Sequence, residues 1–374
     1  MYKYPVFEGS VVAQGANGGV EAGRGFSFQK CAALCLLLDD FPSFGKRKYF
    51  LAFEHHDDFL FAFYDDNESL DEVKAYQAKK KQLSSSWGTD DKLAKILCKL
   101  TITGQSINQD NSIIKSLGYR HSLSFISNAE IKLTNGKLGK ERKSISVKED
   151  TTPIQFLKLD KEIQKKLEEI INSHVEPNDI SEVVSLEFAN ICLTHNHKVN
   201  KEYLVGKMTN MFGDKISDYV AAVDVLMTLF TDSELEMNKN SLPKLSHEAK
   251  WIAKSQIDNA MDILTSKKKA YNLWRDYAGV LGKSLKIKFG HSRNYQEHID
   301  NCFDGFKSLL NSELIRVRSL VKEHISIIDD EYNECDGIIA LVNYITSEYS
   351  ISLEPHIIVF AVIASYVEME DICG

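Results

Sequence analysis

The fold of this chain is decided by the stretch Phe50–Lys81, which reads FLAFEHHDDFLFAFYDDNESLDEVKAYQAKKK. Two aromatic runs, at residues 49–54 and 59–64, have the composition and length of buried β-strands. A third run, at residues 71–79, follows an acidic turn at residues 65–70 and has the composition of another strand. The stretch therefore predicts three consecutive strands, joined first by a bend and then by a turn.

The bend carries two acids, Asp57 and Asp58, inside a pattern that is otherwise apolar. A buried unpaired charge disfavours folding by several kcal/mol unless it meets a cation or a hydrogen-bond donor. On the third strand, Gln77 and Lys79 are two residues apart, so both side chains point to the same face of the sheet. The bend and the third strand together hold the candidate functional site.

A carboxylate from one strand, with an oxygen ligand and a lysine from the next, is the minimal apparatus for Mg²⁺-assisted hydrolysis of a phosphodiester. The oxygens of Asp58 and Gln77 would hold the metal, which polarises the phosphoryl group and its water. The ammonium of Lys79 would stabilise charge or position the nucleophile. The match is short, and the competing interpretation is a hairpin with ordinary surface charges. The order of the surrounding elements is what favours the active-site interpretation over the hairpin.

Helices are expected before and after the three strands, at residues 21–40 and 89–99. A further strand is expected at residues 119–133. The resulting order, a helix, three strands carrying the acid and the Gln-x-Lys pair, and a second helix, is that of the restriction-endonuclease-like fold.

Near residue 150 the apolar period changes from two to 3.6, and nearly all of the later chain has the pattern of helices, including residues 180–195. We therefore expect an α+β protein with a nuclease-like domain over residues 1–150 and an all-helical domain over residues 151–374.

Composition is that of an ordinary globular protein of two domains, with 374 residues, 43% hydrophobic and 26% charged. The chain has no apolar run of membrane-spanning length and no signal-peptide pattern, so a cytoplasmic protein without a membrane partner is expected. Its seven cysteines form no CxxC pair, which favours reduced thiols. The net charge of −8 argues against a protein that coats nucleic acid, but it leaves room for a nuclease with a local basic patch.

Several other motifs are better explained as structure than as sites. The pair His55-His56 flanks a strand end. The histidines His195 and His197 lack further ligands at the spacing of a zinc site. The segment Gly206–Thr209 lacks the upstream glycine of a P-loop, so ATP binding by this chain is not expected. Among the basic runs, Lys80 and Lys81 adjoin the candidate site and are the predicted contacts to DNA phosphate.

Five segments together resemble a known family, the PD-(D/E)xK effector endonuclease domain of bacterial antiphage systems. They are GG followed by RGFSFQ (Gly18, Gly19 and Arg24–Gln29), FEHHDDFLF (Phe53–Phe61), AYQAKKK (Ala75–Lys81), SSSW (Ser84–Trp87) and SLSFISNAE (Ser122–Glu130). The resemblance covers about residues 15–135. The domain is familiar from CBASS effectors that carry a SAVED domain and from the nuclease subunits of Lamassu and HerA-coupled systems.

The resemblance implies a double-stranded DNA endonuclease that uses Mg²⁺ or Mn²⁺, with Asp58 on the metal and Gln77 and Lys79 completing the site. Gln77 stands where the motif has Glu or Asp, which removes one negative charge, although an amide oxygen is still a ligand for Mg²⁺. Glu54 and Asp57 are alternative sources of the missing charge. The resemblance places Gln29, on the first helix, as a supporting polar group.

The resemblance also implies an effector subunit of a multi-subunit antiphage or antiplasmid complex, kept inactive until it is released or oligomerised. A Lamassu-like assembly with an SMC-like ATPase is favoured, and a HerA-type ring is the alternative. Because one active site cuts one strand, a homo-oligomer is expected during double-strand cleavage. The rival interpretations are a non-catalytic adaptor with a degenerate nuclease domain and an RNase on the same scaffold.

Overall fold

The computed structural model describes residues 18–82, 85–174, 181–238, 243–307 and 311–373. Ser84 of the SSSW segment lies outside the described residues. The chain divides into two compact units, of which the first comprises Met1–Leu204 and Leu229–Ile252 and the second Val205–Thr228 and Ala253–Gly374.

The three predicted strands are confirmed and form an antiparallel meander in the first unit. They are β1 (Tyr49–Phe53), β2 (Phe59–Tyr64) and β3 (Leu70–Lys79). β1 and β2 are buried almost throughout, and Phe59 lies opposite Tyr76 in the register of β2 and β3. Burial on both faces explains why these strands are aromatic runs and do not alternate with polar residues.

β3 also begins the parallel half of a mixed sheet of seven strands, in the order β7-β8-β4-β3-β2-β1-β9. The parallel partners are β4 (Lys115–Ser127) and β8 (Leu186–Asn190), and the edges are β7 (Ile154–Gln155) and β9 (Ile252–Ala253). The α+β class expected from the sequence is therefore confirmed. β7 and β8 follow residue 150, so the first compact unit continues beyond the point at which the apolar period changes.

Residues 180–195, predicted to be helical, are the clearest error of the sequence analysis. Residue 180 lies outside the described residues; residues 181–185 form a short 3₁₀ helix, and β8 follows and pairs with β4 from Leu123 to Ser127. Leu186 and Phe188 are both fully buried. Leu186 and Phe188 are two residues apart, which fits a strand. A run this short fits the helical period as well, and here the pairing with β4 determines that it forms a strand.

The predicted strand at residues 119–133 is likewise split in two. β4 ends at Ser127, and β5 (Ile131–Thr134) pairs instead with β6 (Ser144–Val147) in a separate two-stranded sheet. The remaining short elements of this unit are α2 (Phe41–Phe44), α4 (Lys161–Asn172), η1 (Gly139–Glu141), η2 (Glu149–Thr151), η3 (Phe156–Lys158), η4 (Ser181–Ser185) and η6 (Glu248–Lys250).

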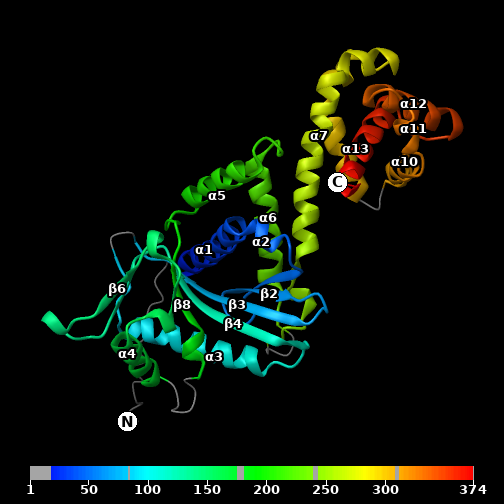
Figure 1. Cartoon of the computed structure of the whole chain (residues 1–374). Coiled ribbons are helices and arrows are strands. Elements are labelled where there is room, and N and C mark those ends of the chain that lie inside the picture. Colours follow the sequence, from blue (N-terminus) through cyan, green and yellow to red (C-terminus); the bar gives the residue numbers. More distant parts are fainter. Residues whose placement is uncertain (1–17, 83–84, 175–180, 239–242, 308–310, 374) are drawn as a thin grey trace, which may run out of the picture. The chain divides into compact units, whose positions relative to one another are not determined.

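Two long helices cover opposite faces of the large sheet: α1 (Gly18–Asp39) and α3 (Asp91–Gln109) (Figure 1). Alternate residues of β3 divide between these faces. Val73 belongs to the same core cluster as Leu97 of α3, whereas Tyr76 stacks on Phe59 on the other face. Gln77 and Lys79 follow Val73 at even spacing, so they lie on the α3 face.

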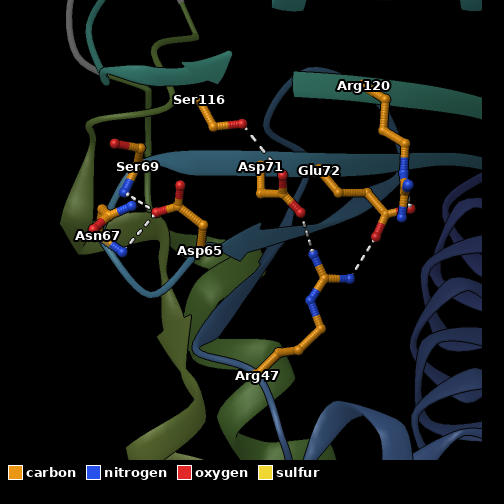
Figure 2. A network of polar contacts seen from close by, with 8 residues as sticks. All are labelled: Arg47, Asp65, Asn67, Ser69, Asp71, Glu72, Ser116 and Arg120. Atoms are coloured by element: carbon orange, nitrogen blue, oxygen red, sulfur yellow. Dashed lines mark hydrogen bonds and ion pairs between the residues drawn. The ribbon is translucent and has the colours of Figure 1, made fainter. Parts of the chain in front are cut away.

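A polar network holds the start of β3 (Figure 2). Arg47, which precedes β1, forms ion pairs with Asp71 and Glu72. From β4, Arg120 lies 3.1 Å from Glu72, and the Ser116 hydroxyl donates to Asp71 at 3.2 Å. The network ties β3 to β4 and to the segment before β1, at the end of β3 away from Lys79.

The second unit is helical. Its elements after residue 253 are α7 (Lys254–Ser284), α8 (Phe289–Arg293), α9 (Tyr295–Lys307), α10 (Ser312–Glu323), α11 (Ser326–Asp329), α12 (Glu334–Glu348) and α13 (Pro355–Cys373). α5 (His197–Phe212) and α6 (Tyr219–Leu235) contribute residues to both units. In the core of the second unit, Trp274 of α7 packs on Phe360 of α13 with ring centroids 4.7 Å apart. Within the described ranges, no helix has the length and apolar character that a membrane span requires.

Candidate active site

The candidate site lies where β2 begins and β3 ends. Asp58 directly precedes β2, and the pairing of Phe59 with Tyr76 places Asp58 beside the last residues of β3. One oxygen of Asp58, Oδ2, accepts the Ala78 N–H at 2.8 Å and lies 3.3 Å from Nζ of Lys79. The structure therefore brings together the acid and the lysine that the sequence predicted.

The two groups differ sharply in exposure. The Asp58 side chain is 5% exposed, whereas that of Lys79 is 37% exposed. A carboxylate buried this deeply needs the hydrogen bond and the cation that it has here, because water does not solvate it. The lysine, in contrast, extends from the buried acid to the surface, where a substrate phosphate can reach it.

Gln77 is the most buried member of the group, at 1% exposure. Its Nε2 is buried and has no hydrogen-bond partner within the part of the chain that the structure describes. A buried unpaired amide costs about 1–3 kcal/mol, so it is an unusual feature that calls for a role. Since the two ends of a glutamine amide exchange by a simple flip, the oxygen can occupy the same position and serve as a ligand.

Asp57 is held by α3. Its Oδ1 accepts the N–H of Asp58 at 3.0 Å and lies 3.3 Å from Nζ of Lys99, and its Oδ2 lies 3.4 Å from the Thr103 hydroxyl. Burial raises the pKa of Asp57 from 3.8 to about 6, and the Lys99 ammonium opposes that rise. The aspartate is thus an anion near neutral pH that the protein stabilises incompletely.

Glu54 opens the bend in a strained conformation, with φ of +45°. Its N–H donates to the carbonyl of Asp58 at 3.0 Å, which closes residues 54–58 into a tight loop. A positive φ is costly for a residue with a Cβ and is often found at functional sites. Partial burial, and next the charge of Asp58, raise the pKa of the Glu54 carboxyl.

The acids on this loop and the amide of Gln77 form a set of oxygen donors suited to a hard cation such as Mg²⁺. Neither oxygen of Asp57 is free of a partner, because one meets Lys99 and the other meets Thr103. In contrast, no described side chain bonds the Glu54 carboxylate. The residues present therefore fit a divalent metal, with Asp58 and Gln77 as its predicted ligands.

Gln29 is buried on α1, 7% exposed. This helix covers the sheet face opposite to the one that carries Gln77 (Figure 1). Among the described residues no hydrogen bond joins Gln29 to either aspartate. No described contact connects Gln29 to the candidate site, and its supporting role stays a prediction.

The two histidines of the bend are buried and neutral. Burial lowers the pKa of His55 to about 4 and that of His56 to about 3. Nδ1 of His55 lies 3.0 Å from the Asn238 side chain, and neither ring bonds Asp58. Nε2 of His55 and both ring nitrogens of His56 are buried without a hydrogen-bond partner among the described residues, so no contact assigns either ring a role at the candidate site.

The predicted DNA contacts follow β3. The ammonium of Lys81 donates to the Ser86 carbonyl at 2.9 Å and lies 3.8 Å from the centre of the Trp87 ring. The side chain of Asn128 bonds both the N–H and the carbonyl of Lys81. Lys81 therefore fixes the chain after the site, and Lys80, beside it, is half-buried.

Sequence reasoning missed Lys99 and Thr103, the two α3 residues that meet Asp57. A signal was present, because they are four residues apart and so lie on one face of the helix. Nothing in the local pattern, however, tells which strand that face meets.

Comparison with protein families agrees with the geometry. The family model described as "Cap4, dsDNA endonuclease domain" matches residues 17–233, which is more than half of the chain and includes every residue of the candidate site. A search of curated proteins and a search of solved structures found no match. With the α+β fold and the acid and Gln-x-Lys arrangement, this match shows that the chain belongs to the family of the Cap4 double-stranded DNA endonuclease domain, a nuclease of antiphage defence.

Proposed function

We propose that this endonuclease cleaves double-stranded DNA with Mg²⁺, or Mn²⁺ in its place, held by Asp58 and Gln77. The observation that carries the proposal is the ion pair between buried Asp58 and partly exposed Lys79, beside a buried Gln77 amide nitrogen that has no partner among the described residues. A bound divalent ion would polarise the scissile phosphate and lower the pKa of the attacking water.

Lys79 has the role of stabilising charge on the phosphate. Its Nζ is 3.3 Å from Asp58, and its stem is partly exposed, so it can stay beside the acid while it donates to a phosphate oxygen. Such donors act most strongly where water is excluded, and Asp58 provides a buried anchor for this one.

Glu54 is the better candidate for the negative charge that Gln77 does not supply. Both oxygens of Asp57 already have partners on α3 or on the backbone, whereas the Glu54 carboxylate has none among the described side chains. Asp57 would then orient the bend and hold Lys99 close. Contacts to the DNA backbone would come from Lys80, and from any donor of Lys81 left free by Ser86.

At the level of assembly, we propose an effector subunit of a Lamassu-like complex, restrained until a partner releases it. Support comes from the sequence resemblance and from the helical second unit, which adds a surface for docking to a chain whose first unit carries the site. The partner would be an SMC-like ATPase, with a HerA-type ring as the alternative. The active form would be a homo-oligomer, because each site cuts one strand.

Cleavage of supercoiled plasmid tests the function. We would incubate the full chain with Mg²⁺ or Mn²⁺, alone and with the proteins encoded beside it, next to Asp58→Ala and Lys79→Ala. Lys95→Ala is the matched control, because this exposed lysine pairs with Asp91 one turn away on α3 and with no other acid among the described residues. Cutting by wild type and control but not by the two site variants supports the proposal.

The same assay separates the rivals. If wild type and both site variants are equally inert on DNA and RNA in every mixture, the chain is an adaptor. If the protein cuts RNA but not plasmid DNA, it is an RNase with the same fold.

A further inference from the structure

Three histidines from three helices meet in the second unit, far along the chain from the nuclease site. His291 lies in α8, His298 in α9 and His356 in the first turn of α13. Their candidate ligand nitrogens all lie within 4.8 Å of one another. Chance does not favour such a cluster, because the three residues have to be brought together by three separate helices.

The closest pair already has the spacing of shared coordination. Nδ1 of His291 lies 3.4 Å from Nε2 of His298. Two nitrogens bound at about 2.0–2.1 Å to one tetrahedral zinc ion are roughly 3.3–3.4 Å apart.

Neighbouring groups orient two of the rings. The carboxylate of Glu354 lies 3.3 Å from Nδ1 of His356, which leaves Nε2 of that ring for a metal. Metal-binding histidines very often have a carboxylate beside their second ring nitrogen. The ring of His298 stacks on Phe360, with centroids 5.1 Å apart and planes 17° apart, so its plane is fixed by the core.

We propose that His291, His298 and His356 bind one transition-metal ion of the zinc type, with Glu354 orienting His356 and the fourth position open to water. Imidazole nitrogens favour zinc, copper and nickel over magnesium, so this site would be distinct in chemistry from the oxygen-rich nuclease site. The ion would join α8 and α9 to the start of α13.

One ring has to turn when the ion binds. His291 now stacks on His356, with centroids 3.6 Å apart and planes 15° apart, and two stacked rings do not both point at a shared ion. His291 lies on a helix of five residues, and a turn of its ring that leaves Nδ1 in place would open the stack and keep the 3.4 Å spacing to Nε2 of His298. The side-chain nitrogen signals of this histidine are therefore expected to change most on metal binding.

The test is titration of the full chain with zinc after removal of metal by a chelator. We expect about one zinc per chain, a rise in the melting temperature, and cobalt substitution that gives the absorption bands of tetrahedral nitrogen ligation. His298→Ala and His356→Ala should abolish all three, and Glu354→Gln should weaken zinc binding by roughly tenfold or more.

Two controls keep the result specific. His324→Ala changes a histidine of the same unit that bonds Tyr349, and Asp58→Ala disables the nuclease site, so zinc binding should be unaffected in both. If His298→Ala fails to fold because Phe360 loses its neighbour, His291→Ala tests the same site from a more exposed position. Zinc binding that is equal in wild type and in a folded His291→Ala or His356→Ala variant would overturn the proposal.

Discussion

Replacement of Asp57 by asparagine should stabilise the nuclease unit. The carboxylate is almost fully buried, and burial raises its pKa from 3.8 to about 6 despite the ion pair with Lys99. A tenfold change in a proton affinity corresponds to about 1.4 kcal/mol, so the ionised group lowers the free energy of unfolding by about 3 kcal/mol at pH 7. Asparagine removes that charge, and its oxygen can still accept the Asp58 N–H.

The gain should depend on pH in a defined direction. Between about pH 4 and pH 6 the folded chain keeps the Asp57 proton longer than the unfolded chain does, so stability falls as the pH rises through this window. Above the window the full penalty applies. Asp57→Asn should thus gain about 2–3 kcal/mol at pH 8 and roughly half of that at pH 5.

Hydrogen exchange of the β3 amides, measured without divalent metal at pH 8 and pH 5, reports the opening free energy of this unit. Asp58→Asn is the matched neighbour: it weakens the acceptor for Ala78 and Lys79, so it should give no gain. If Asp57→Asn is less stable than wild type at pH 8, the argument that ionised Asp57 lowers the free energy of unfolding is wrong.

Three further predictions concern catalysis. Gln77→Leu should abolish Mg²⁺-dependent cleavage, because it removes the amide oxygen from a buried site. Gln77→Glu should lower the Mg²⁺ concentration that gives half-maximal cleavage. Equal activity of wild type and both variants would refute a ligand role for Gln77. The Mg²⁺ concentration that gives half-maximal cleavage should rise as the pH falls, because the raised pKa of Glu54 brings this candidate ligand closer to protonation; a flat titration from pH 8 to pH 5 would contradict this. Lys80→Ala should reduce the slope of log affinity for DNA against log salt by about one, and an unchanged slope would exclude a phosphate contact.

The proximity of the predicted site residues could be inferred from the sequence because it depends on local structure. Asp58, Gln77 and Lys79 are brought together by two neighbouring antiparallel strands and a short turn, and the two-residue spacing alone determines that Gln77 and Lys79 share a face. The short aromatic runs of β1 and β2 do not fit the helical period of 3.6, so only a strand was predicted for them. The central strands were therefore predictable almost to the residue.

The errors and omissions all depend on contacts between distant segments. β8 pairs with β4 across some sixty residues of sequence, and its short apolar run fits a helix as well as a strand. The partners of Asp57 on α3, Lys99 and Thr103, meet it only after the helix has docked on the sheet. The three-histidine cluster is of the same kind, because its members are separated by 7 and 58 residues in the chain.

The central claim is that Asp58 binds the catalytic metal, and a change of metal preference tests it most directly. Asp58→Cys replaces a hard oxygen ligand by a soft sulfur ligand at the same place, so cleavage of plasmid DNA with Mg²⁺ should be lost and cleavage with Mn²⁺ or Cd²⁺ should return at least in part. The reaction would be run under the conditions in which wild type cuts, with Lys79→Ala as the variant that no metal restores. Undiminished cleavage by Asp58→Cys with Mg²⁺ would contradict the account.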